Sequence, residues 1–258
     1  MPPEDVSPSH ACAEAGHVAG LAKHVLASLQ ARATPDAIVP DGVARMLVTR
    51  LLEDAEAFPA EAVIAECLSR GVGSADLVDH VIPQAARHLG ECWDASDLSF
   101  ARVTIAAARL QEMLGCLARG EAQDQGRASS RAAPGILVVT MRGDHHTLGW
   151  KLVTVQLRRQ GYPADAAPDV TPKQAAGLVC DACYDLVLVS ASRLEALDDV
   201  AEMARCVAVR DAPLPPVVVG GIVADRVRAD TRIPGVVAFT TSLTEAISHR
   251  RRPTRRPR

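Results

Sequence analysis

A short polar segment, GDHHTLG at residues 143–149, carries the side chains best suited to chemistry in this 258-residue sequence. It follows the apolar run GILVVTM and precedes WKLVTVQLRRQG, which has the periodicity of an amphipathic helix. A histidine in such a turn can bind a metal through one ring nitrogen while a carboxylate accepts a hydrogen bond from the other. Asp144 and His146 have the types for this pairing, and His145 is an alternative metal ligand. Gly149 would let a bulky ligand approach the backbone.

The elements around this segment predict an α/β domain. Apolar runs and one shorter strand after Tyr162 alternate with helical stretches that follow Gly149 and lie near Pro172, Leu194 and Ala224. The expected strands are 135–141, 163–167, 185–192, 215–221 and 235–242. Uniformly apolar strands separated by helices indicate a parallel sheet covered on both faces. Five strands suit a flavodoxin-like order, in which ligands bind at the carboxyl ends of the strands.

The first half of the chain predicts a helical bundle. Apolar residues recur at helical spacing, and proline, glycine and polar residues mark the breaks. The expected helices are 10–31, 43–56, 59–71, 74–95 and 99–118. Short connections between helices favour antiparallel packing. We therefore divide the chain into an N-terminal extension with one helix (1–40), a bundle (41–118), a linker (119–134), an α/β domain (135–249) and a basic tail (250–258).

The segment after the first strand resembles the signature of cobalamin-binding domains. The string G-D-x-H-x-x-G-x-x-x-V is filled by Gly143, Asp144, His146, Gly149 and Val153. The family includes methionine synthase, corrinoid methyl carriers and cobalamin-dependent light-responsive regulators. The resemblance implies that His146 is the lower cobalt ligand, that Asp144 is its hydrogen-bond partner, and that the nucleotide tail of the cofactor enters a slot between the sheet and its helices. His145 falls on the variable position.

Other residues fit the same template. The resemblance places Ser190 at the end of the third strand and Gly220 and Gly221 after the fourth, where all three would line the nucleotide slot. Ser192 departs from the S-x-L pattern, in which a leucine follows at that position. In the bundle, Trp93 shortly after Leu-Gly would lie over the upper face of the corrin. Phe100 would be its neighbour, so both are assigned to the cofactor site.

The bundle sequence SFARVTIAAARLQ, followed by GDHHTLG, is similar to the AerR/PpaA-type antirepressors of purple photosynthetic bacteria. That resemblance implies a light- or redox-responsive regulator that acts through a transcriptional repressor and takes adenosyl-, methyl- or hydroxocobalamin. Val103 and Thr104 stand where MerR-like light sensors have a Glu-His pair. The histidine of that pair is their upper cobalt ligand, so we do not expect the same upper ligand here. The alternatives are a corrinoid methyl carrier and a haem-binding redox sensor with His145 or His146 as ligand.

Composition sets the class of protein. The chain is 48% apolar and only 3% aromatic, with a net charge of −3. We expect a cytoplasmic globular protein, because there is no signal segment, no run of about 20 apolar residues, and an odd number of scattered cysteines. The arginine-rich tail 250–258 is either a solubilising end or a contact with DNA or an acidic partner. No membrane contact is expected, and the oligomeric state is open.

Weaker signals are interpreted as structural. Cys180 and Cys183 form a single C-x-x-C, which without a second pair favours buried thiols over zinc. The N-terminal group of His10, Cys12, His17 and His24 is interpreted as a helix face. His80 and His88 are expected to be ordinary bundle residues, with an approach of either to the upper face of the corrin as the alternative. No nucleophile–base set, P-loop or paired-carboxylate site is recognisable, so we predict a protein that is not an enzyme, with the methyl-carrier role left as the alternative. No helix-turn-helix is recognisable either, so specific DNA contact is expected to come through a partner.

Overall fold

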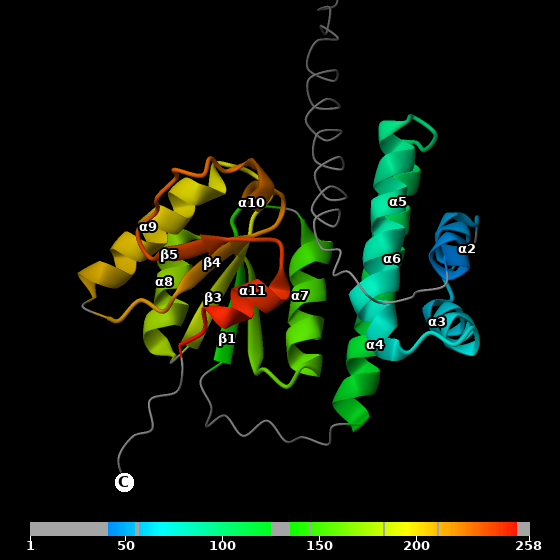
Figure 1. Cartoon of the computed structure of the whole chain (residues 1–258), viewed down its shortest axis with the longest axis horizontal. Helices are drawn as coiled ribbons and strands as arrows, with labels where there is room; N and C mark the ends of the chain where they lie inside the picture. Colours follow the sequence, from blue (N-terminus) through cyan, green and yellow to red (C-terminus); the bar gives the residue numbers. More distant parts are fainter. Residues whose placement is uncertain are drawn as a thin grey trace, which may run out of the picture.

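The computed structural model describes residues 41–54, 57–124, 135–144, 146–182, 184–210 and 212–251 (Figure 1). A helical bundle lies beside an α/β domain. The bundle contains α2 (Asp41–Leu52), α3 (Ala60–Ser69), α4 (Ser74–Asp76), the π-helical turn η1 (Leu77–Val81), α5 (Ile82–Asp94) and α6 (Phe100–Asp124). No helix within the described ranges combines the length and the apolar character that crossing a bilayer requires.

The helix predicted over 74–95 is continuous but changes its hydrogen bonding at η1. The backbone N–H of Ile82 donates to the carbonyl of Leu77, five residues earlier. Pro83 follows directly, and its ring lacks an N–H and would crowd the carbonyl four residues before it. The wider π turn therefore accommodates a proline within a helical segment.

The last bundle helix is longer than the sequence predicts. α6 continues to Asp124, so residues 119–124 of the expected linker are helical, and 125–134 lie outside the described residues. Alanine, arginine, glutamate and glutamine are good helix formers, and they extend a helix whose apolar periodicity has already ended. Composition alone could not separate this polar helix end from a linker.

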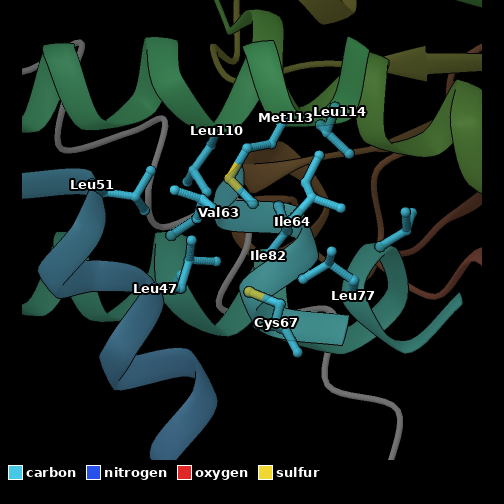
Figure 2. Close-up of a cluster of buried hydrophobic side chains, with 14 of the residues drawn as sticks. Leu47, Leu51, Val63, Ile64, Cys67, Leu77, Ile82, Leu110, Met113 and Leu114 are labelled. Carbon is cyan, nitrogen blue, oxygen red and sulfur yellow. The ribbon is translucent and has the colours of Figure 1, made fainter. Parts of the chain in front are cut away.

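The bundle encloses a core of leucine, valine and isoleucine (Figure 2). Leu47 and Leu51 of α2, Val63 of α3 and Leu110 and Met113 of α6 point toward one another there. Three residues of the α/β domain, Leu148, Leu152 and Val155, belong to the same buried cluster. The bundle and the α/β domain thus share a core rather than merely touching.

The α/β domain contains a five-stranded parallel sheet in the order β2-β1-β3-β4-β5, which confirms the predicted flavodoxin-like order. Its strands are β1 (Gly135–Met141), β2 (Ala164–Val170), β3 (Tyr184–Ser190), β4 (Val217–Gly220) and β5 (Val236–Phe239). Its helices are α7 (Thr147–Arg159), α8 (Pro172–Asp181), α9 (Ala196–Val209), α10 (Ile222–Arg226) and α11 (Leu243–Ser248). The strand order reverses between β1 and β3, where such folds bind their ligands.

Alternate residues of each strand enter different cores, which explains why the strands are uniformly apolar. Leu137 and Val139 of β1 pack with α8 and α9, whereas Ile136 and Val138 pack with α7 and α11. Helix α11 was not predicted. Its sequence signal is S-L-T-E, in which the Ser242 side chain accepts a hydrogen bond from the Glu245 backbone N–H as an N-cap.

Helix α7 connects the two halves of the molecule (Figure 1). One face packs Val153 and Leu157 on the sheet, and the other places Leu152 in the bundle core. Lys151 Nζ also donates to Gln111 Oε1 of α6 at 2.8 Å. At the far end of α7, Arg159 forms an ion pair with Asp79 of η1.

The beginning of the predicted basic tail belongs to the folded domain. Arg250 Nε donates to Asp185 Oδ2 at 2.7 Å, and its guanidinium lies 5.3 Å from the centre of the Tyr162 ring. The backbone N–H of Arg251 donates to the Asp185 carbonyl at 3.1 Å. The domain therefore extends two residues past the predicted boundary at 249, and residues 252–258 lie outside the described part.

Candidate cofactor-binding site

The segment 143–149 begins at the carboxyl end of β1. The backbone N–H of Asp144 donates to the Met141 carbonyl at 3.0 Å, which closes a tight turn. Gly143 occupies the third position of that turn with φ 76°, a conformation that favours glycine. His146 then precedes the first residue of α7. The turn thus presents Asp144 and His146 where the strand order reverses.

Asp144 and His146 form a buried pair, as the sequence predicts. His146 Nδ1 lies 2.7 Å from Asp144 Oδ1, and the histidine and aspartate side chains are only 5% and 0% exposed. The other ring nitrogen, Nε2, is buried and has no hydrogen-bond partner in the described structure. An orphaned nitrogen in a protein interior is rare, because an unpaired polar atom there is unfavourable.

The carboxylate fixes the state of the imidazole. Burial opposes ionisation of Asp144, but the hydrogen bonds from His146 and Ser192 outweigh it and hold the pKa of Asp144 below its usual value. An ionised carboxylate only accepts hydrogen bonds, so Nδ1 must carry the proton in the Asp144–His146 bond. Nε2 of a neutral ring then presents a lone pair, which is the form that binds a metal ion.

Sequence reasoning missed the contribution of Ser192. Its backbone N–H donates to Asp144 Oδ2 and its hydroxyl donates to Asp144 Oδ1, both at 2.8 Å. In the sequence, this position stands out only as a departure from S-x-L. Leucine has no hydroxyl to donate, so the departure itself completes the set of bonds to the carboxylate. A hydroxyl near the carboxyl end of a neighbouring strand was the available signal.

A slot lies between the sheet and the helices α7 and α11. Its lining includes two of the predicted residues, Ser190 and Gly220, together with Thr240 and Leu243. A Cβ built on Gly149 would lie 3.4 Å from Ser190 Oγ, and one on Gly220 would lie 3.2 Å from the Thr240 carbonyl oxygen. The slot volume is about 30 Å³, room for a water or two. A larger group would enter only if the slot widened.

Gly221 has a structural reason to be glycine. Its φ is 85°, and a Cβ there would lie 2.4 Å from the Ala191 carbonyl oxygen. That carbonyl belongs to the segment that follows β3 and carries Ser192. The close approach of two backbones after neighbouring strands therefore holds Ser192 near Asp144, although Gly221 does not line the slot.

The bundle residues assigned to the site lie apart from this cluster. Trp93 is half-buried against the bundle core at the end of α5, and Phe100 is 38% exposed at the start of α6. Helices α6 and α7 run in the same direction (Figure 1), and Gln111 of α6 contacts Lys151 of α7. Counted back from this contact at the rise per residue of an α-helix, the start of α6 lies about 10 Å beyond the start of α7. Both aromatic residues thus lie toward the carboxyl-edge end of the molecule.

Several sequence assignments fall outside the described residues or show no site. His145, Cys183 and the N-terminal group of His10, Cys12, His17 and His24 are not described. His88 lies 3.8 Å from Cys92 Sγ through Nε2 and 3.6 Å from Glu91 through Nδ1, on an exposed part of α5. His80 lies in η1. Within the described ranges, no three side chains of His, Cys, Asp or Glu gather as a metal cluster.

Comparison with known proteins gives a family match over the α/β domain. Residues 134–249 match the family model described as the B12 binding domain, which supports a cobalamin-binding domain. A Rhodobacter capsulatus protein named "Uncharacterized 20.5 kDa protein in bchF-crtJ intergenic region" is 29% identical over 174 residues, which cover 67% of this chain and 89% of the relative.

The solved structures that resemble the chain include two cobalamin proteins. A novel cobalamin-binding protein from Desulfitobacterium hafniense is 18% identical, with a TM-score of 0.39, over 82% of this chain and 97% of that one. The methanol:cobalamin methyltransferase complex MtaBC from Methanosarcina barkeri is 18% identical, with a TM-score of 0.36, over 74% of this chain and 71% of that one.

Proposed function

We propose that the α/β domain binds cobalamin with His146 as the lower cobalt ligand. The observation that carries this proposal is the buried imidazole whose Nδ1 is bound to Asp144 and whose Nε2 has no partner. The match of residues 134–249 to the B12 binding domain supports the choice of cofactor. Asp144 would keep Nδ1 protonated and strengthen Nε2 as a donor to cobalt.

The remaining assigned residues would hold the rest of the cofactor. Ser190, Gly149 and Gly220 would receive the nucleotide tail between the sheet and α11, which requires the slot to widen, and Gly221 would hold the backbone beside it. Trp93 and Phe100 of the bundle would cover the upper face of the corrin. When bound, cobalamin supplies a cobalt centre whose upper ligand responds to light or to oxidation and reduction.

We further propose that the protein is a light- or redox-responsive regulator of transcription that acts through a repressor protein. The relative encoded in the bchF-crtJ region, a photosynthesis gene region, supports this role. The shared core at Leu152 and the ion pair between Arg159 and Asp79 would couple the cofactor domain to the bundle. A change at the upper ligand would shift the bundle only if it favoured one of two arrangements. The arginine tail would add affinity for DNA.

The deciding experiment is spectroscopic. The purified chain is incubated in the dark with adenosyl-, methyl- or hydroxocobalamin, and separately with haem, and absorption is recorded before and after illumination. A stable corrinoid complex with a light-dependent change supports the regulator. A complex without a light response that passes a methyl group from a donor to an acceptor overturns the regulator in favour of a methyl carrier. Uptake of haem alone overturns the choice of cofactor.

Two neighbouring variants test the ligand assignment. His146→Ala should remove the cobalt ligand and shift the spectrum of the bound cofactor, whereas His145→Ala should leave most of that spectrum in place. A larger effect of His145→Ala would show that the ligand is assigned to the wrong histidine. Circular dichroism of both variants controls for loss of folding.

A further inference from the structure

The peptide unit between Arg142 and Gly143 is held at both of its polar ends. The Gly143 N–H donates to Asp169 Oδ1 at 3.0 Å, and Arg193 Nη2 donates to the Arg142 carbonyl at 3.2 Å. Asp169 comes from β2, and Arg193 comes from the segment after β3. We propose that Asp169 and Arg193 are positioning residues that clamp this peptide and thereby fix the loop carrying Asp144 and His146.

The turn needs such a clamp because its own hydrogen bond does not select one arrangement. The bond from the Asp144 N–H to the Met141 carbonyl is compatible with two orientations of the central peptide, which differ in the sign of φ at the third residue. That residue is Gly143, and glycine adopts either sign readily. The side chains of Asp169 and Arg193 bind only the orientation observed, with φ 76°.

Asp169 is itself held in an unusual conformation. Its φ is 55°, and Ser96 is the only other non-glycine residue in the described ranges with a positive φ. The left-handed region is unfavourable for L-residues, and aspartate and asparagine tolerate it best. The Asp169 N–H donates to the hydroxyl of Thr140 at 3.0 Å, and Thr140 is 1% exposed. A buried side chain thus anchors the backbone that carries the clamping carboxylate.

The clamp lies where regular strand pairing is interrupted. The register between β1 and β2 shifts between Val139 and Met141. Side-chain bonds at Thr140 and Asp169 therefore join the two strands at the irregularity that leads into the turn. Unusual backbone conformations gather at functional sites when surrounding contacts fix them. A rotated Arg142–Gly143 peptide would break both clamp bonds and change the direction in which the chain enters Asp144.

This inference rests on the proposed role of His146, and its test separates the two. Asp169→Gly removes the acceptor and keeps a residue that accepts the left-handed conformation. Asp169→Asn keeps both an oxygen acceptor and tolerance of that conformation, so it is the matched control. Arg193→Met removes the donor on the other side. Thermal unfolding of each full-length variant verifies that it folds.

The first measurement needs no cofactor. In the apoprotein, hydrogen exchange of the Gly143 amide should accelerate about tenfold in Asp169→Gly, the effect of losing roughly 1.4 kcal/mol of protection, and should stay near the wild-type rate in Asp169→Asn. NMR of the His146 ring nitrogens should show the Nδ1-protonated form less fully populated in Asp169→Gly and in Arg193→Met. Unchanged exchange and an unchanged ring state in both variants would overturn the clamp.

The second measurement uses the protein loaded with hydroxocobalamin, after the bound cobalt has been reduced to Co(II). In protein labelled with 15N-histidine, a two-line splitting of the cobalt electron paramagnetic resonance signal reports ligation by His146, because the cofactor's own 14N base would give three lines. We expect Asp169→Gly and Arg193→Met to lose part of that splitting and to bind about tenfold more weakly, as changes behind a metal ligand typically do, with Asp169→Asn close to wild type. Wild-type affinity and splitting in both variants would overturn the clamp. Failure of the wild type to take up cobalamin would instead overturn the proposed function, and the apoprotein data would still judge the clamp.

Discussion

Ser192 donates its backbone N–H to one carboxylate oxygen of Asp144 and its hydroxyl to the other, each at 2.8 Å. His146 shares the oxygen that accepts from the hydroxyl. A buried carboxylate is tolerated only when hydrogen bonds replace its lost hydration. The bonds from Ser192 therefore let an ionised Asp144 lie behind the imidazole, and they make Ser192 part of the arrangement that fixes the ring.

Ser192→Ala should lower the free energy of unfolding by about 1.5–3 kcal/mol, the usual contribution of a hydrogen bond to a charged group. The backbone N–H of residue 192 would remain, so the carboxylate would keep a partner. Chemical denaturation of the apoprotein measures the change. Ser248→Ala is the control, because Ser248 donates to the Glu245 carbonyl at an exposed site, and we expect less than about 0.5 kcal/mol there. Equal effects of the two variants would contradict the role of Ser192.

Gly149→Ala should leave the apoprotein as stable as the wild type or more stable by up to about 1 kcal/mol. Gly149 lies in the first turn of α7, alanine is the better helix former, and the added Cβ would make an ordinary 3.4 Å contact with Ser190 Oγ. Cobalamin affinity should nevertheless fall, because the methyl group narrows the approach to Ser190. Thermal unfolding and cofactor titration measure the two effects, and unimpaired binding would remove Gly149 from the site.

Gly221→Ala should behave in the opposite way. A Cβ 2.4 Å from the Ala191 carbonyl oxygen cannot be accommodated, and φ 85° is strained for alanine. We expect a loss of stability of at least about 1–3 kcal/mol from the backbone conformation alone, measured by denaturation. A stable variant would show that the chain after β3 can move away from β4.

Acid should weaken the native state through Asp144. Its pKa in the folded protein lies below the value of about 3.9 that an unfolded chain has, so its ionised form stabilises the native state. That contribution is complete above the unfolded pKa and is lost as the pH falls through the folded pKa. In urea titrations from pH 7 to pH 3, the stability difference between wild type and Asp144→Asn should therefore shrink below about pH 4. A difference that stays constant would contradict the shift.

Much of the fold could be predicted because each pattern reflects local chemistry. The uniformly apolar strands of the sheet, such as Ile136 to Val139, can only be buried on two faces, and this implies parallel order and helices on both sides. The pairing of Asp144 with His146 followed from residue types two positions apart in one turn. The prediction failed where a polar segment is helical, as at the end of α6, where residues 119–124 were expected to form a linker.

The residues that were missed act across the fold. Ser192 reaches Asp144 from 48 positions away, and Asp169 reaches Gly143 from 26 positions away. No periodic pattern in the sequence links residues so far apart, because only the order of the strands in the sheet brings these strand ends together. The conformation of Asp169, with φ 55°, also has no signature stronger than a polar residue near a strand end.

The ion pair between Asp79 and Arg159 should couple the bundle to the α/β domain measurably. Their side chains are 27% and 18% exposed, so water screens the pair only in part. A double-mutant cycle with Asp79→Ala and Arg159→Ala should give a coupling free energy of about 1 kcal/mol from chemical denaturation. The matched control is the exposed pair Arg228–Asp230, with side chains 84% and 73% exposed.

For that exposed pair, the same cycle should give a coupling near zero, because solvent and salt screen it. If the bundle transmits the state of the cofactor, Asp79→Ala should also weaken the effect of illumination on the bundle. The spectrum of the bound cofactor should stay unchanged, since Asp79 of η1 contacts the end of α7 that is remote from His146. Hydrogen exchange of α5 and α6 in dark and illuminated protein measures this transmission. Equal light-induced exchange in wild type and variant would show that the shared apolar core around Leu152, rather than the ion pair, carries the coupling.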